Sequence, residues 1–148
     1  DLLQRNVLPI TPTAVRFAAI VTPVVEAALA VAATKTLEIV PAGELDARLS
    51  CDAGLVERMV AALLEHALAN APNGSRVDVD GRRSAGDRFC IRVAHHGRAV
   101  TTAALDKYFT TLPLRFCRLA AIRHGGTLRA VSPVADEAGL AFEIELPA

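Results

Sequence analysis

Three short stretches of this sequence carry side chains that could bind a ligand or a metal ion. His66 and Asn70 are one helical turn apart, and His95 follows an apolar, strand-like run. A neutral imidazole has one ring nitrogen that accepts a hydrogen bond, so either histidine could receive a donor from a ligand. Residues 108–114 lead into a helical segment, and Arg115 lies near its start. A helix start with an arginine beside it is suited to binding phosphate.

The helix that positions His66 is predicted over residues 55–71. Apolar residues occur there at positions 55, 56, 59, 60, 63, 64, 67 and 68, which is the spacing of a helix with one buried stripe. A rotation of about 100° per residue places Ala62, His66 and Asn70 together on the flank of that stripe, whereas Glu65 points towards solvent. A ligand held between this helix and a sheet would lie on that flank.

The other elements follow from capping residues, prolines and alternating apolar residues. An apolar helix is predicted to end near residue 33, with Pro23 as a kink or a restart, and Asp52 is predicted to cap the next helix. A third helix runs from about Pro113, a residue favoured at the first helical position, to a stop at Gly125. Strands are predicted at residues 36–40 and 45–49 around a turn at 41–44, at 77–79 and 89–93 as a hairpin, and at 127–131 and 140–146.

The composition indicates one globular domain. The chain has 148 residues, is 52% hydrophobic, and has 16 basic and 16 acidic residues, so disorder is excluded and nucleic-acid binding is not expected. The three cysteines are widely spaced in apolar surroundings, which indicates reduced thiols and a cytoplasmic location. Residues 17–33 contain Pro23 and Glu26 and predict a buried helix rather than a membrane span. No direct membrane contact is expected.

The chain begins at Asp1 without a methionine, which suggests a fragment of a longer protein. Residues 1–13 contain two prolines and are predicted to be a linker from an upstream helix, and residues 14–148 are predicted to be the single domain.

The order of these elements, with residues 108–114 and His124-Gly125-Gly126, resembles the catalytic ATP-binding domain of sensor histidine kinases. This nucleotide fold is shared with DNA gyrase and MutL. The resemblance covers nearly the whole chain, and Phe109-Thr110-Thr111 is similar to the Phe-Thr-Thr of the nitrogen-regulator subgroup. It implies an α+β fold: a two-layer α/β sandwich of the Bergerat type, with about three helices on one face of a mixed, mainly antiparallel sheet.

The resemblance also implies a nucleotide site. The family asparagine that holds magnesium aligns with His66, an earlier asparagine aligns with Ala62, and the Asp-x-Gly-x-Gly box that reads the adenine amine aligns with residues 95–99. The Gly-x-Gly-Leu box that binds phosphates aligns with residues 111–114. The ATP-binding residues implied are His66, Asn70, His95, Gly97, Ala99, Thr110, Thr111, Leu112, Leu114 and Arg115, and His66 and Asn70 are the implied ligands of Mg²⁺ or Mn²⁺.

Several family features are replaced here. Proline at position 113 has no N–H for a phosphate, and the family's flexible lid is nearly deleted between Phe109 and Leu112. A hydrogen bond to a charged group is worth roughly 1.5–3 kcal/mol, and micromolar binding needs about 8 kcal/mol, so three such losses leave millimolar binding unless other residues compensate. His95 could accept from the adenine amine, in which case affinity should fall as the pH drops through about 6.5.

The function implied is transfer of the ATP γ-phosphate to a histidine on the protein's own upstream dimerisation and phosphoacceptor domain, and from there to a response regulator, in a homodimeric full-length kinase. The phosphoacceptor itself is expected upstream of Asp1, so no catalytic residue is expected in this chain. Two alternatives stay open. The chain could be a degenerate pseudokinase module that docks a partner, or a piece of another ATPase of this fold, although that class has a glutamate where this sequence has Ala62. His66, His95 and His96 could also form part of a zinc site.

Overall fold

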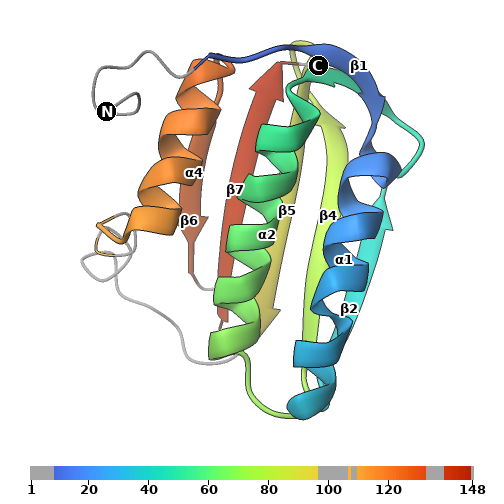
Figure 1. The fold of residues 1–148 in the computed structure, drawn as a ribbon, viewed down its shortest axis with the longest axis vertical. Coiled ribbons are helices and arrows are strands. Elements are labelled where there is room, and N and C mark those ends of the chain that lie inside the picture. The colour runs from blue at the N-terminus through green and yellow to red at the C-terminus, as the bar shows by residue number, and fades with distance from the viewer. Residues whose placement is uncertain (1–8, 97–106, 108–109, 133–138, 148) are drawn as a thin grey trace.

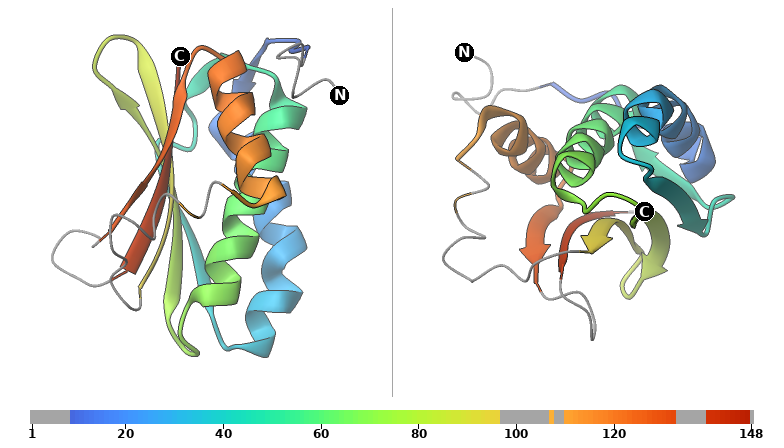
Figure 2. Two further views of the ribbon diagram at one scale, coloured as in Figure 1. Left: turned by 90° about the vertical axis from the view of Figure 1, so that its left-hand side faces the viewer. Right: turned by 90° about the horizontal axis from the view of Figure 1, so that it is seen from below.

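The computed structural model describes residues 9–96, 107, 110–132 and 139–147. Its main sheet has five strands: β2 (Glu38–Gly43), β4 (Arg76–Ser84), β5 (Arg88–His96), β7 (Gly139–Pro147) and β6 (Thr127–Val131), in that order. Strands β2 and β4 are parallel, and the other neighbours are antiparallel. The helices α1 (Phe17–Thr34), α2 (Ala53–Asn70) and α4 (Leu112–Arg123) cover one face of this sheet (Figures 1 and 2). The predicted two-layer α/β sandwich is therefore confirmed.

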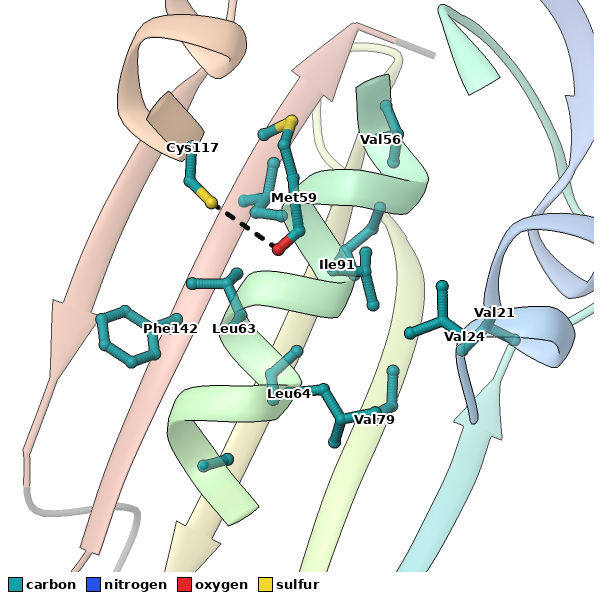
Figure 3. Packing of buried hydrophobic residues seen from close by; sticks show 14 of the residues in the cluster. Val21, Val24, Val56, Met59, Leu63, Leu64, Val79, Ile91, Cys117 and Phe142 are labelled. Atoms are coloured by element: carbon teal, nitrogen blue, oxygen red, sulfur yellow. Dashed lines mark hydrogen bonds between the residues drawn. The ribbon is translucent and has the colours of Figure 1, made fainter. Parts of the chain in front are cut away.

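Helix α2 occupies the centre of the helix layer, as its apolar spacing requires. Its predicted stripe is buried over the sheet, with Met59, Val60 and Leu63 fully inaccessible. On the sheet side, the alternating residues of β7 that were predicted to share a face are also buried, namely Leu140, Phe142, Ile144 and Leu146. Figure 3 shows this core between α2 and the strands. The flank residues of α2 are consequently held next to the sheet by a rigid, well-packed element.

Side chains cap the start of α2 and tie it to its neighbours. The carboxylate of Asp52 accepts from the backbone N–H of Leu55 at 3.2 Å, as predicted, and also from that of Thr11 at 2.9 Å. The imidazole of His124, just after α4, accepts from the backbone N–H of Asp52 at 3.0 Å and donates to the carbonyl of Ala120 at 2.8 Å. These bonds join the segment that enters the domain, the start of α2 and the end of α4.

The predicted β4–β5 hairpin is confirmed, and so is the pairing of β6 with β7. The hairpin turn contains Gly86 and Asp87 with positive φ angles of 75° and 57°, a conformation that glycine and aspartate tolerate. Helix α4 ends where predicted, because Gly125, which follows the C-cap residue His124, adopts a φ of 77°.

The prediction for residues 36–49 was partly wrong. The expected turn at 41–44 overlaps β2, which continues through Pro41 and Gly43 and pairs in parallel with β4. Proline is tolerated there because β2 is an edge strand. The next strand, β3 (Arg48–Cys51), does not pair with β2; it pairs with β1 (Thr13–Arg16) in a separate two-stranded sheet. The chain between them caps α1 instead, since the carbonyls of Leu45 and Ala47 accept from its first N–H groups.

Helix α1 is long and apolar enough to cross a membrane by length and composition, yet it lies in the helix layer of the domain. It runs through Pro23 as one continuous helix rather than restarting there. The prediction of a buried helix holds for one face, which contains Phe17 and Ile20. The rest of α1 is exposed and still apolar, with Leu29 53% and Val31 55% accessible.

Candidate functional site

A depression of about 230 Å³ lies between the predicted flank of α2 and the start of α4. Its lining residues come from these two helices and the residue before α4: Ala62, Glu65, His66, Ala69, Asn70, Thr111, Pro113 and Leu114. Two stretches more than 40 positions apart in the sequence, each predicted to bind the nucleotide, therefore meet in one place. Glu65 is exposed on its rim, as the helical projection predicts.

His66 is half-buried on the sheet side of this depression. Its ring packs edge-on against Phe142 of β7, with the ring centroids 5.2 Å apart and an interplanar angle of 87°. Burial lowers the pKa of His66, and the nearby charge of His95 lowers it further. His66 is therefore neutral at pH 7 and can act as a hydrogen-bonding group or a metal ligand.

His95, at the end of β5, is only 5% exposed. Its Nδ1 lies 3.0 Å from the carbonyl oxygen of His96, which can only accept, so Nδ1 carries the proton and Nε2 holds the free lone pair. Among the described residues, Nε2 has no hydrogen-bond partner. The pKa of His95 is lowered mainly by burial, with smaller contributions from the charges of His96 and Lys35, against the raising effect of the His96 carbonyl. His95 is thus a neutral, buried hydrogen-bond acceptor at the end of β5, and it is not among the residues that line the depression.

Asn70 stands at the exposed end of α2. Its side-chain Nδ2 donates to the carbonyl of His66 at 2.8 Å, one turn earlier. One N–H of the amide is used in this bond, so the Oδ1 atom and the second N–H of Asn70 are left to face a ligand. It is one of the lining residues of the depression.

The start of α4 differs from the prediction by one position. Thr111 is the N-cap residue, Leu112 is the first helical residue and Pro113 is the second. The proline leaves this helix start one N–H short of the usual four. Leu114 is buried in the core, whereas Leu112 is 77% exposed.

The remaining predicted residues are less close to the depression. Arg115 is exposed on α4 and is not among the lining residues. Thr110 is also exposed, and its hydroxyl donates to the carbonyl of Lys107 at 2.7 Å. Leu112 lies in a neighbouring depression with Arg58 and Phe116. Gly97 and Ala99 are outside the described residues.

Lys35 was missed by the sequence analysis. It follows α1, and its ammonium donates to the carbonyls of Leu68, Ala69 and Ala71 at the end of α2, at 2.9, 3.3 and 2.8 Å. Its charge also lowers the pKa of His95. No local pattern points to this role, because the lysine and its acceptors are 33 or more positions apart.

The donors on this flank are a poor match for Mg²⁺. Magnesium prefers an octahedral set of oxygen ligands, and the depression offers one imidazole, the exposed amide of Asn70 and the rim carboxylate of Glu65. Within residues 9–96, 107, 110–132 and 139–147, no group of three or more His, Cys, Asp or Glu side chains is arranged to hold a metal ion. The structure therefore gives no support for the zinc alternative among these residues.

No protein-family model and no curated protein matches the sequence, but solved structures match the fold closely. The histidine kinase AdeS of Acinetobacter baumannii matches with a TM-score of 0.85 and 17% identity, over 99% of this chain and 72% of that one. The catalytic domain of the histidine kinase ThkA matches with a TM-score of 0.82 and 16% identity, over 93% and 97%.

Two larger structures contain the same fold within a longer chain. Full-length ShkA in complex with AMPPNP matches with a TM-score of 0.84 and 18% identity, over 98% of this chain and 33% of ShkA. ThkA in complex with the response regulator TrrA matches with a TM-score of 0.82 and 16% identity, over 98% and 45%. Sequence identities of 16–18% are low enough that the likeness shows the fold alone. This chain has the fold of the catalytic domain of histidine kinases.

Proposed function

We propose that this chain is the ATP-binding catalytic domain of a divergent two-component sensor histidine kinase. It would present the γ-phosphate of ATP to a histidine on the protein's own upstream dimerisation domain, from which a response regulator would take the phosphoryl group. The support is the fold, together with the AMPPNP bound by ShkA and the response regulator bound by ThkA. Phosphoryl transfer of this kind depends mostly on positioning and charge stabilisation, so the absence of a carboxylate at Ala62 is compatible with it.

The observation that carries the proposal is the buried Nε2 atom of His95. A buried acceptor without a partner costs about 1–3 kcal/mol, which a ligand that donates a hydrogen bond to it would recover. The exocyclic amine of adenine is such a donor. His95 stands on β5 at the position that the resemblance assigns to adenine recognition, and its charge lowers the pKa of His66. The base would lie between α2 and the sheet.

The phosphate end of the nucleotide would lie at the depression between α2 and α4. Thr111 and the N–H groups of the first turn of α4 would meet the phosphates, and Arg115 could reach them from the second turn. A divalent cation would supply charge neutralisation, with Asn70 Oδ1 and His66 as its candidate ligands. Because it includes an imidazole nitrogen, this donor set should prefer a transition metal such as Mn²⁺ to Mg²⁺. The all-oxygen set of the family has less of this preference.

Calorimetric titration of the domain tests the proposal directly. ADP and AMPPNP would each be titrated with Mg²⁺, with Mn²⁺ and without metal, and GDP would serve as the control, because guanine presents a carbonyl in place of the adenine amine. Saturable binding of ADP with little binding of GDP supports an adenine site at His95. Equal binding of ADP and GDP would contradict it.

The second candidate is a docking module that keeps the fold and has lost tight nucleotide binding. The observation in its favour is the start of α4, where Leu112 is 77% exposed and borders an apolar depression of about 480 Å³ with Ala61, Pro113 and Phe116. An exposed leucine beside an apolar depression is typical of a protein-binding surface. A response regulator or the dimer of the kinase itself would be the partner. The absence of binding at millimolar nucleotide would favour this function.

Two further assignments remain proposals. The nitrogen-regulator subgroup depends on the run 109–111, of which Phe109 lies outside the described residues. A cytoplasmic location is supported by Cys51, Cys90 and Cys117, which are all free thiols. Burial raises the pKa of Cys51 to about 11 and that of Cys117 to about 12, so these two thiols are unreactive core groups.

A further inference from the structure

An arginine without an acidic partner borders the depression that was assigned to the phosphates. The neighbouring depression beside Leu112 is lined by Arg58, Ala61, Ala62 and Glu65 from α2 and by Leu112, Pro113 and Phe116 from α4. The two depressions adjoin each other, because Ala62, Glu65 and Pro113 line both. Helices α2 and α4 run antiparallel and side by side here (Figure 1). A ligand at the start of α4 can therefore extend between the two helices towards Arg58.

An aromatic ring holds the guanidinium of Arg58 in place. The central carbon of the guanidinium lies 4.4 Å from the centroid of the Phe116 ring, which is a cation–π contact. Stacking uses the flat face of the guanidinium and leaves its N–H groups, which lie in the plane, free to donate. Arg58 forms no ion pair with any residue that the structure describes. Its charge is therefore available to an anionic ligand.

The other charged groups of this region are used elsewhere or lie at the other end of the two depressions. Lys35 donates to three carbonyls at the end of α2, and Arg115 lines neither depression. Glu65 is the acidic residue that lines both. It lies two helical turns after Arg58, about 10 Å along the axis of α2, and it is adjacent to His66, where the divalent cation is proposed. The carboxylate is thus on the metal side, and the guanidinium is on the opposite side.

The position of Arg58 suits the terminal phosphate of a nucleotide. In the proposed function a histidine of another domain must reach the γ-phosphate, so this phosphate has to lie at the solvent side of the cleft. Arg58 is exposed, whereas His95 is buried at the end of β5. Pro113 leaves the start of α4 one N–H short, and a guanidinium nearby supplies donors that the helix lacks. The planar guanidinium can donate two N–H groups to one phosphate.

We propose that Arg58 binds the γ-phosphate of ATP and that Phe116 positions its guanidinium. This inference rests on the proposed nucleotide site and adds to it the residue that distinguishes ATP from ADP.

Calorimetric titration with ADP and with AMPPNP, each in the presence of Mn²⁺, tests the role of Arg58, because only AMPPNP has a γ-phosphate. Arg58→Met should lower the affinity for AMPPNP at least about fivefold and change the affinity for ADP less than about twofold. Arg58→Lys should recover only part of the loss, because an ammonium keeps the charge but cannot donate in the paired geometry of a guanidinium. Phe116→Leu should also weaken AMPPNP more than ADP, because it removes the ring that orients Arg58.

Arg48→Met is the matched control. Arg48 is an exposed arginine on β3 that lines neither depression, so its loss should leave both affinities within about twofold. Urea unfolding of each variant checks the fold, which matters most for the partly buried Phe116. NMR gives an independent readout. The Nε–H signal of Arg58, assigned by its absence in Arg58→Met, should shift on addition of AMPPNP and not on addition of ADP.

The outcomes separate this inference from the proposed function. If ADP binds and Arg58→Met keeps the preference for AMPPNP, the role of Arg58 is wrong and the nucleotide site stands. Equal losses of ADP and AMPPNP affinity in Arg58→Met would also overturn the inference, because the arginine would then not act on the γ-phosphate. No binding of either nucleotide at millimolar concentration would overturn the nucleotide site and this inference with it.

Discussion

Replacing Lys35 by methionine should destabilise the domain and change the titration of His95 at the same time. Methionine keeps an unbranched apolar stem and removes the ammonium that donates to Leu68, Ala69 and Ala71. These carbonyls are the acceptors that α2 leaves unused at its C-terminal end. The two bonds to Leu68 and Ala71 are partly buried, whereas the bond to Ala69 is exposed.

The size of the effect follows from these contacts. A hydrogen bond to a charged group contributes about 1.5–3 kcal/mol, and a cation at a helix C-terminus adds about 0.3–1 kcal/mol. In the variant, water hydrogen-bonds to the freed carbonyls and recovers part of this stabilisation, because Lys35 is only half-buried. We therefore expect a loss of about 2–3 kcal/mol in the free energy of unfolding. For a domain of this size, that corresponds to a decrease in Tm of about 4–12 °C.

Urea unfolding and histidine NMR measure the two effects. Lys107→Met, at an exposed lysine, is the matched control and should change stability by less than about 0.5 kcal/mol. The pKa of His95 should rise in Lys35→Met, because the charge of Lys35 contributes to lowering it, and should stay low in Lys107→Met. A stability loss below about 0.5 kcal/mol together with an unchanged pKa would refute the reasoning.

Three further predictions concern His95 and the start of α2. His95→Phe removes the buried acceptor and should weaken ADP binding by about 5- to 150-fold in calorimetry, whereas His96→Phe, one position along and on the other face of β5, should change it little; similar losses in both would contradict the assignment. Because the pKa of His95 lies below 6.5, ADP affinity should be constant above about pH 6.5 and fall only at lower pH, when Nε2 gains a proton. A decrease centred at or above pH 6.5 would exclude His95 as the acceptor. Asp52→Ala removes the cap of α2 and should cost about 1–2 kcal/mol in urea unfolding, most of which Asp52→Asn should restore; an unchanged midpoint would show that the cap contributes nothing.

The burial that lowers the pKa of His95 also makes the stability of the domain depend on pH. The unfolded chain binds a proton at this histidine from about pH 6.5 downwards, whereas the folded chain binds it only at a lower pH. Stability should consequently decrease as the pH falls below about 6.5.

The parts of the fold with a local signal were predicted correctly. Helix α2 has an uninterrupted apolar period and an aspartate cap, and large apolar residues occupy every second position of β7 from Leu140 to Leu146, so both elements follow from the sequence pattern alone. The parts that failed depend on distant pairing. The local pattern of Pro41 and Gly43 is that of a turn, and only the parallel neighbour β4 makes these residues part of a strand.

The residues of the candidate site show the same difference between features that local geometry predicts and features that depend on distant contacts. Ala62, His66 and Asn70 were placed on one flank because helical geometry alone decides it, and the structure brings them next to Thr111 and Leu114. The tautomer of His95 could not be predicted, because it is set by the carbonyl of His96 in the folded chain. The contacts of Lys35 join the ends of two helices that the sequence does not connect.

The most direct test of the proposed function is calorimetric titration of the domain with ADP in the presence of Mn²⁺ at pH 7.5. The account predicts saturable binding at one site with a Kd of about 1 mM or tighter, which corresponds to at least about 4 kcal/mol, and a clear weakening in His95→Phe. No saturable binding at millimolar ADP would contradict the proposed nucleotide site.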